Sequence, residues 1–274
     1  MFHWLSRQDA SPAGSLRGHE VRKLDYAERW LRDGFALCRP PSFSQSLEVD
    51  MTRAKRLLDS AREQSIRLTY THLIVRAAAL VLAASPDLHV MVCGNRVHRP
   101  ARVDIGLSVS GDKFMAPVLL IDDAGRKNLR AIADEVVRRT PEARIADSRM
   151  LALLRKWGWI LPFGFVRRAL LRVLRQSFAF RRRGSGTFQV SIVPGVDRFE
   201  TPLFNTAAIL TAGSVRERIV AADGVPAARL TVHLTCCADH RVWDGNMCQT
   251  FLLALRDLLE SNSLESELDP LRYE

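Results

Sequence analysis

Residues 230–245, LTVHLTCCADHRVWDG, decide the fold. Apolar side chains occupy every second position of the first half, at Leu230, Val232, Leu234, Cys236 and Ala238. This two-residue period predicts a β-strand with one buried face. The strand ends at Asp239-His240-Arg241, and apolar residues at helical spacing follow Asp244-Gly245. A rigid strand that ends before a helix can present His240 as a general base; the structural alternative is a solvated turn whose aspartate caps the helix.

On both sides of this stretch, helices are mixed with antiparallel hairpins. We expect strands over residues 43–49, 89–93, 96–98, 103–109, 114–121, 187–193, 208–215 and 227–238. Helices are expected after residue 50, over 69–84, from 128 onwards and after 245. Because no regular alternation of strand and helix occurs, the pattern favours an α+β two-layer sandwich, a mixed sheet with helices packed on it. Neither GxGxxG nor GxxxxGK[ST] is present, which argues against the usual dinucleotide and nucleoside triphosphate sites.

The composition is that of a folded protein. Its 274 residues suffice for one large domain or two small ones. With 47% hydrophobic and 26% charged residues, the chain is neither disordered nor a multi-span membrane protein. No run reaches the about 18 apolar residues that a spanning helix requires. The five cysteines lack metal-site spacing and fit a reducing cytoplasm.

The net charge of +10 comes from one segment. Residues 149–183 contain ten basic residues and no acidic residue, so the rest of the chain is balanced. A basic excess favours a partner with phosphates: nucleic acid, a coenzyme or a membrane surface. Because the excess is confined to one segment, it describes that segment rather than the whole protein.

Several further motifs accompany the turn at His240. They are Gly186-Thr187-Phe188-Gln189-Val190-Ser191, Ala208-Ile209-Leu210 with Gly213, and Asp104-Ile105-Gly106-Leu107-Ser108-Val109 with Pro117-Val118. In order and spacing, residues 43–139 and 186–260 resemble the catalytic domain of the acyltransferase component of 2-oxo acid dehydrogenase complexes. That family shares its fold with chloramphenicol acetyltransferase, so the resemblance implies a chloramphenicol acetyltransferase-like fold.

The resemblance also implies a chemistry, acyl transfer from a coenzyme A thioester without a metal. His240 would be the general base and Ser191 the hydrogen-bond donor to the tetrahedral oxyanion. Asp244 would fix the turn through a salt bridge or, less in keeping with the family, relay a proton. The family forms homotrimers with active sites between subunits, the histidine coming from one chain and the serine from its neighbour.

Three departures from the family bear on function. Only 41 residues, an N-terminal lead-in, precede the catalytic domain at 42–274, and Asp112-Lys113 resembles a lipoyl-lysine site too poorly to count as one. We therefore expect a stand-alone coenzyme A-dependent acyltransferase acting on a thiol, hydroxyl or amine. The alternatives are a lipoyl-dependent core acyltransferase that uses a carrier on another chain, and a non-catalytic trimeric scaffold.

The second departure concerns residues near the substrate channel of the family. Lys113-Phe114 and Ile192-Val193-Pro194-Gly195 replace the usual residues there, which indicates a changed acceptor.

The third departure is a basic amphipathic helical insertion at about 145–185, expected as two short helices over 150–160 and 165–178. Basic residues with Trp and Phe are typical of a helix lying on an anionic membrane. The expected docking residues are Arg155, Lys156, Trp157, Trp159, Arg167, Arg168, Arg172 and Arg175. The alternatives are a helical hairpin packed on its own domain, and nucleic acid binding, which nothing else in the chain supports. The expected location is cytoplasmic, peripheral at the inner face of a membrane.

Overall fold

The computed structural model describes residues 22–38, 40–110, 116–222 and 224–268. Within them, seven strands form one mixed sheet in the order β1-β9-β7-β6-β4-β5, with β8 paired to β9. The strands are β1 (Ser42–Asp50), β4 (Ile105–Ser108), β5 (Val118–Ile121), β6 (Phe188–Ile192), β7 (Ala208–Ala212), β8 (Arg216–Ala222) and β9 (Val225–Asp239). A separate hairpin is made by β2 (Met91–Cys93) and β3 (Arg96–His98). The expected strands occur, several of them shorter than expected, and residues 111–115 of one hairpin lie outside the described residues; β8 was not expected.

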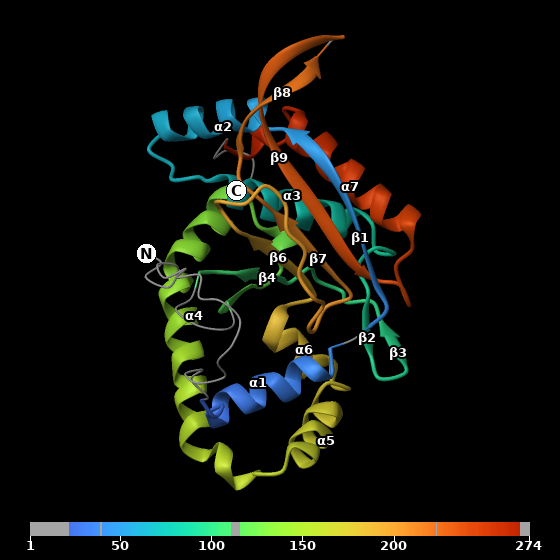
Figure 1. Cartoon of the computed structure of the whole chain (residues 1–274). Helices are drawn as coiled ribbons and strands as arrows, with labels where there is room; N and C mark the ends of the chain where they lie inside the picture. The colour runs from blue at the N-terminus through green and yellow to red at the C-terminus, as the bar shows by residue number, and fades with distance from the viewer. Residues whose placement is uncertain (1–21, 39, 111–115, 223, 269–274) are drawn as a thin grey trace, which may run out of the picture.

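Helices cover one face of the sheet, which confirms the two-layer α+β sandwich (Figure 1). They are α2 (Thr52–Glu63), α3 (Tyr70–Ala84), α7 (Gly245–Glu260) and the start of α4 (Leu129–Trp157), with the 3-10 turns η1 (Ala124–Arg126) and η3 (Glu265–Leu268) beside them. The core lies between the layers. The alternating face of β9 points into it: Val232, Leu234, Cys236 and Ala238 are fully buried. The opposite face of β9 is covered near its end by a smaller cluster around Cys237.

The second part of the molecule is helical, and here one sequence prediction is wrong. The residues expected as a short helix over 150–160 are the end of α4, which continues unbroken through Pro141 to Trp157, whereas the helix expected over 165–178 occurs in a shorter form. After the 3-10 turn η2 (Gly158–Ile160) come α5 (Gly164–Leu174) and α6 (Phe178–Ser185). Figure 1 shows α1 (Tyr26–Ala36) lying between the far half of α4 and α5. Residues of the expected lead-in are therefore the packing partner of the basic insertion.

Among the described helices, none is both long and apolar enough to cross a membrane. Ion pairs join the helices of the basic insertion to α1. Arg167 of α5 and Asp33 of α1 are 2% and 1% exposed, with 2.7 Å between Nη2 and an Oδ oxygen. A close backbone approach adds to this joint: a Cβ at Gly158 would lie 2.9 Å from Cβ of Tyr26.

Candidate active site

His240 follows the last residue of β9 and is held by its backbone. Its N–H donates a hydrogen bond to the carbonyl oxygen of Pro41 at 2.8 Å, which fixes the turn against the start of β1. The imidazole is exposed and lies against Phe43, with 4.7 Å between ring centroids. An imidazole that is open to a substrate and supported on one side by an aromatic ring is suited to act as a general base.

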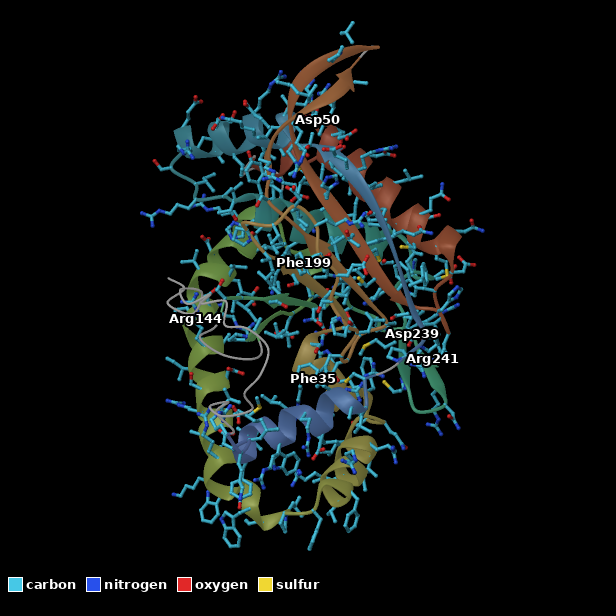
Figure 2. The ribbon with its side chains drawn as sticks, in the orientation of Figure 1. Phe35, Asp50, Arg144, Phe199, Asp239 and Arg241 are labelled. Atoms are coloured by element: carbon cyan, nitrogen blue, oxygen red, sulfur yellow. The ribbon has the colours of Figure 1, made fainter. Side chains whose placement is uncertain are left out.

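The residues on either side of His240 make the turn rigid. Asp239 is buried, and its carboxylate accepts hydrogen bonds from Nε of Arg241 at 2.9 Å and Nη2 at 2.6 Å. The backbone N–H of Arg241 donates to the same carboxylate at 3.1 Å. The backbone N–H of Asp239 donates to the carbonyl of Ala207 in turn. Figure 2 shows Asp239 and Arg241 at the lower end of β9. The bidentate pair therefore fixes both neighbours of the exposed histidine.

Asp244 has a different structural role from the expected salt bridge. Its Oδ1 accepts a hydrogen bond from the N–H of Met247 at 2.8 Å, so it caps the N-terminus of α7. No ion pair to Asp244 exists within the described ranges, because Arg241 is already committed to Asp239. The cap also positions Trp243, which is buried and lies edge-on to Phe251 at 5.7 Å between centroids. Within one chain, the structure therefore shows the alternative named above, an aspartate that caps the helix after the turn, in place of a salt bridge.

Ser191 and His240 do not meet within one chain. Ser191 lies on β6, opposite Thr211 of β7, and Thr211 lies opposite Thr235 of β9. Thr235 precedes Asp239 by four residues. At about 3.4 Å per residue along a strand and about 4.8 Å between strands, Ser191 and Asp239, the residue before His240, are about 17 Å apart. One chain therefore cannot bring this serine hydroxyl and this imidazole to the same carbonyl carbon.

The comparisons with known proteins can now be set beside this geometry. The family model described as 2-oxoacid dehydrogenases acyltransferase (catalytic domain) matches residues 36–150 and 184–265. The chain belongs to this acyltransferase family. The match includes Ser191 and the whole turn at His240. It leaves out residues 151–183, so the basic insertion is an addition to the shared domain.

Characterised members of the acyltransferase family are distant relatives of the chain. The lipoamide acyltransferase component of the branched-chain alpha-keto acid dehydrogenase complex of Bacillus subtilis is 26% identical over 222 residues, 78% of this chain and 46% of the relative. The corresponding protein of Pseudomonas putida is 28% identical over 262 residues, 91% of this chain and 52% of the relative. The chain spans about half the length of these relatives.

Solved structures confirm the fold of the acyltransferase family. A probable dihydrolipoamide acetyltransferase from Listeria monocytogenes superposes with a TM-score of 0.66 at 22% identity, covering 89% of this chain and 95% of that chain. The cubic core of the pyruvate dehydrogenase multienzyme complex gives a TM-score of 0.66 at 20% identity, covering 93% and 98%. The expected chloramphenicol acetyltransferase-like fold and family are therefore confirmed.

The docking residues expected in the basic insertion do not share one outer face. Arg167 is buried against Asp33 and also donates to the carbonyls of Leu161 and Pro162, so its assignment to a docking surface is wrong. The other inward contacts run from Arg155 to Asp25, from Arg168 to Asp33 and from Arg175 to the carbonyl of Phe204. Trp157, Trp159, Lys156 and Arg172 are exposed. The arginine residues of α5 point inwards because the buried carboxylate of Asp33 on α1 requires a cation as its partner.

The sequence analysis missed a cluster of guanidinium groups near the turn. Arg181 of α6 is 8% exposed, and burial lowers its pKa, with Arg175 and Arg241 close enough to add to this effect. Its Nε donates to the carbonyl of Asn205 at 2.6 Å, while its two Nη groups have no hydrogen-bond acceptor in the described part of the chain. Arg175 donates to the side-chain oxygen of Asn205 at 3.3 Å. The Arg181-Arg182-Arg183 run resembles an ordinary solvated basic stretch, so the sequence carried no signal for this placement.

Other buried groups in the motifs at Asp104 and Gly186 have a structural role. Thr187 Oγ1 lies 2.7 Å from Nε2 of His89 and accepts a hydrogen bond from the backbone N–H of Asp104. Burial lowers the pKa of His89 to about 4, so this imidazole is neutral at pH 7. A Cβ at Gly186, where φ is +71°, would collide with the carbonyl of Asp104. Lys113 and Phe114, expected near the channel, and Asp112 lie outside the described residues.

The described residues contain no group of three or more His, Cys, Asp or Glu side chains arranged to hold a metal ion. The turn itself presents an imidazole, fixed backbone dipoles and nearby guanidinium groups.

Proposed function

We propose that the chain is a core acyltransferase of the 2-oxo acid dehydrogenase type, which moves an acyl group between a lipoyl carrier on another chain and coenzyme A. The observation that carries this proposal is the exposed imidazole of His240 on a turn held by Pro41 and by the Asp239–Arg241 pair, inside the family match. The relatives are lipoamide acyltransferase and dihydrolipoyllysine-residue succinyltransferase components. They favour this alternative over the stand-alone enzyme expected from the sequence.

The proposed step balances on the groups described. His240 takes the proton from the attacking thiol as its sulfur bonds to the thioester carbonyl carbon. The hydroxyl of Ser191 donates a hydrogen bond to the resulting oxyanion. When the tetrahedral intermediate collapses, the bond to the leaving sulfur breaks and the imidazolium returns its proton to that sulfur. The same groups serve both directions, since each thiol is the attacking group in one and the leaving group in the other.

Ser191 is proposed to act in the active site of a neighbouring copy. Within one chain it lies about 17 Å from Asp239, the residue before His240, as estimated from the strand register. A closed ring of identical chains supplies each histidine with a serine from the next chain, and a trimer is the assembly implied by the resemblance. The solved Azotobacter vinelandii dihydrolipoamide acetyltransferase was studied for a serine, a histidine and an asparagine in its mechanism, the last two numbered four apart. His240 and Asp244 have the same spacing.

The guanidinium groups of Arg175, Arg181 and Arg241 support an anionic co-substrate. The carboxylate of Asp239 is close enough to influence Arg181, and it is already paired with Arg241. The Nη groups of Arg181 therefore remain available for a phosphate or carboxylate. Coenzyme A carries phosphates, so it is the co-substrate that this cluster fits.

A stand-alone acyltransferase with another acceptor is the second candidate. The observation in its favour is the insertion at 151–183, which lies outside the family match and brings Arg175 and Arg181 to the turn. The two candidates differ in the acceptor. Transfer from acyl-coenzyme A to dihydrolipoamide supports the core acyltransferase, whereas coenzyme A release with an amine or hydroxyl compound and none with dihydrolipoamide supports the stand-alone enzyme.

The test is an assay of thiol release and acyl transfer with acetyl-, succinyl- and branched-chain acyl-coenzyme A. His240→Ala is expected to lower the rate at least about 10²-fold, since a positioned general base contributes about 10² to 10⁴. Asn246→Ala is the matched control, because this exposed residue lies just after the turn. Equal rates in wild type and His240→Ala would refute the catalytic assignment. Absence of transfer with every donor and acceptor would leave the non-catalytic scaffold.

A further inference from the structure

The end of the helical insertion exposes a group of large apolar side chains, which we call the apolar tip. Its members are Leu153, Trp157, Trp159, Ile160, Phe163 and Phe165, with exposed fractions from 50% for Trp157 to 66% for Phe165. They surround the connection from α4 through η2 to α5. In Figure 1 this connection is the lowest part of the molecule, at the opposite end from the β8–β9 hairpin.

Packing explains why these side chains are exposed. The side of the connection that faces α1 is occupied by Gly158, Arg167 and Leu151, all buried. The apolar tip is the other side of the same turn, and no described element packs over it. A contiguous apolar group of this size on a soluble protein marks an interaction surface.

Two cations beside the apolar tip have no ion pair among the described residues, while Arg155 is paired with Asp25. Lys156 and Arg172 are exposed and form no ion pair within the described residues, in contrast to Arg155, Arg167 and Arg168. Lys156 lies over the ring of Trp157, with 5.2 Å from Nζ to the centroid. Arg172 follows Phe165 by seven residues, so it lies on the same side of α5, two turns on. Unpaired cations therefore flank the tryptophan and phenylalanine side chains.

We propose that the apolar tip inserts into an anionic lipid bilayer surface, with Lys156 and Arg172 at the level of the lipid phosphates. Tryptophan prefers the interface between headgroups and acyl chains, and long basic side chains extend from apolar surroundings to phosphates. A second copy of the chain is the weaker occupant, because the unpaired charged groups of the tip are cations and the nearby carboxylate of Asp25 is already paired with Arg155. The tip lies in residues 151–183, outside the family match, so the docking surface is separate from the acyltransferase domain.

This proposal corrects the docking surface expected from the sequence. Arg155, Arg167, Arg168 and Arg175 contact groups of their own chain. Of the expected residues, Lys156, Trp157, Trp159 and Arg172 remain, and Leu153, Ile160, Phe163 and Phe165 join them. The proposed contact is the insertion of apolar side chains of a turn into the bilayer, with two cations beside them. The contact expected from the sequence was a helix lying on the membrane with its arginine residues towards the lipids.

The experiment measures co-sedimentation of the full chain with phosphatidylcholine vesicles, with and without phosphatidylserine. The test variant is Trp159→Asn with Phe163→Asn. Its matched control is Ile219→Asn with Val225→Asn, two exposed apolar residues of the β8–β9 hairpin at the other end of the molecule. A third variant, Lys156→Gln with Arg172→Gln, tests the charges. Circular dichroism and acyl transfer are measured on each preparation, and neither is expected to change.

We expect wild type to bind the phosphatidylserine vesicles, the tip variant to lose at least about tenfold in binding, and the hairpin variant to bind like wild type. The charge variant is expected to lose about fivefold per cation at low salt and less at high salt. The proposal is overturned if wild type does not sediment with anionic vesicles at low salt, or if tip and hairpin variants bind equally. A smaller assembly mass in the tip variant, with no vesicle binding by wild type, would assign the surface to a second copy.

Discussion

The buried ion pair between Arg167 and Asp33 holds the insertion to α1, and breaking it should be costly. The perturbation is Arg167→Met, which keeps the length of the side chain and removes its charge. In the structure Nε of Arg167 donates to Oδ2 of Asp33 at 2.8 Å, and Nη2 lies 2.7 Å from the same oxygen in an ion pair. Nη1 donates to the carbonyls of Leu161 and Pro162 at 2.7 and 2.8 Å. Methionine removes all of these hydrogen bonds at once.

The expected loss follows from what is left behind. Removing one partner of a buried pair costs about 3 to 5 kcal/mol, because the other charge stays buried without compensation. Asp33 retains Arg168 at 3.1 Å, which is half-buried, so the cost should lie near the lower end, about 3 kcal/mol. Replacing both partners, with Asp33→Leu and Arg167→Met, removes the stranded carboxylate and should recover most of the loss.

Urea unfolding measures these free energies, and hydrogen exchange of α1 and α5 shows whether the loss is local to the helical part. Arg172→Met is the matched control, since Arg172 lies on the same helix and is exposed; its cost should stay within about 0.5 kcal/mol. If Arg167→Met costs no more than Arg172→Met, or if the double variant is as unstable as Arg167→Met alone, the ion pair does not hold the two helices together.

Three further predictions concern other groups of the chain. Burial lowers the pKa of both His72 and His89 from 6.5 to about 4, so their contribution to the free energy of unfolding is complete above pH 6.5 and falls as the pH drops towards 4. Urea unfolding should show a loss of about 2 kcal/mol per histidine between pH 7 and pH 5. A free energy of unfolding that does not change over this range would contradict the prediction. Arg181→Met should raise the KM for coenzyme A about tenfold with kcat little changed, because one hydrogen bond to a charged group is worth about 1.5 to 3 kcal/mol. An unchanged KM would show that Arg181 does not bind the phosphates of coenzyme A. Asp244→Ala should cost about 1 kcal/mol of stability in thermal unfolding, and Asp244→Ser much less, since serine also caps helices. If both variants instead lose more than about 10³-fold in the rate of acyl transfer, Asp244 relays a proton.

The sequence was sufficient for the turn at His240 and for the strands of the sheet other than β8. Strict alternation over β9 and the turn residues before α7 are local signals, and both occur where expected. The family resemblance rested on motifs at Gly186 and Ala208 that lie on adjacent strands. These features depend on neighbours in the sequence or on a periodic pattern, so they could be recognised without a structure.

The side chains of the insertion depend on a partner far away in the chain. Periodicity shows two stripes on α5 but does not say which faces inwards, and the deciding residue is Asp33, 134 positions before Arg167. The proline at 141 similarly indicates a break in an isolated helix, yet α4 continues past it while packed against α1 and β5. The role of Asp244 was also decided by competition, because Asp239 takes the arginine that a salt bridge would require.

The most direct test of an active site shared between chains is complementation of His240→Ala by Ser191→Ala. Each variant alone is expected to be nearly inactive in acyl transfer from acyl-coenzyme A to dihydrolipoamide. If the variants are mixed in equal amounts and reassembled from dissociated chains, about a quarter of the interfaces combine an intact His240 with an intact Ser191, so about a quarter of wild-type activity should return. Activity in the mixture no higher than in the single variants would contradict a site built from His240 of one chain and Ser191 of the next.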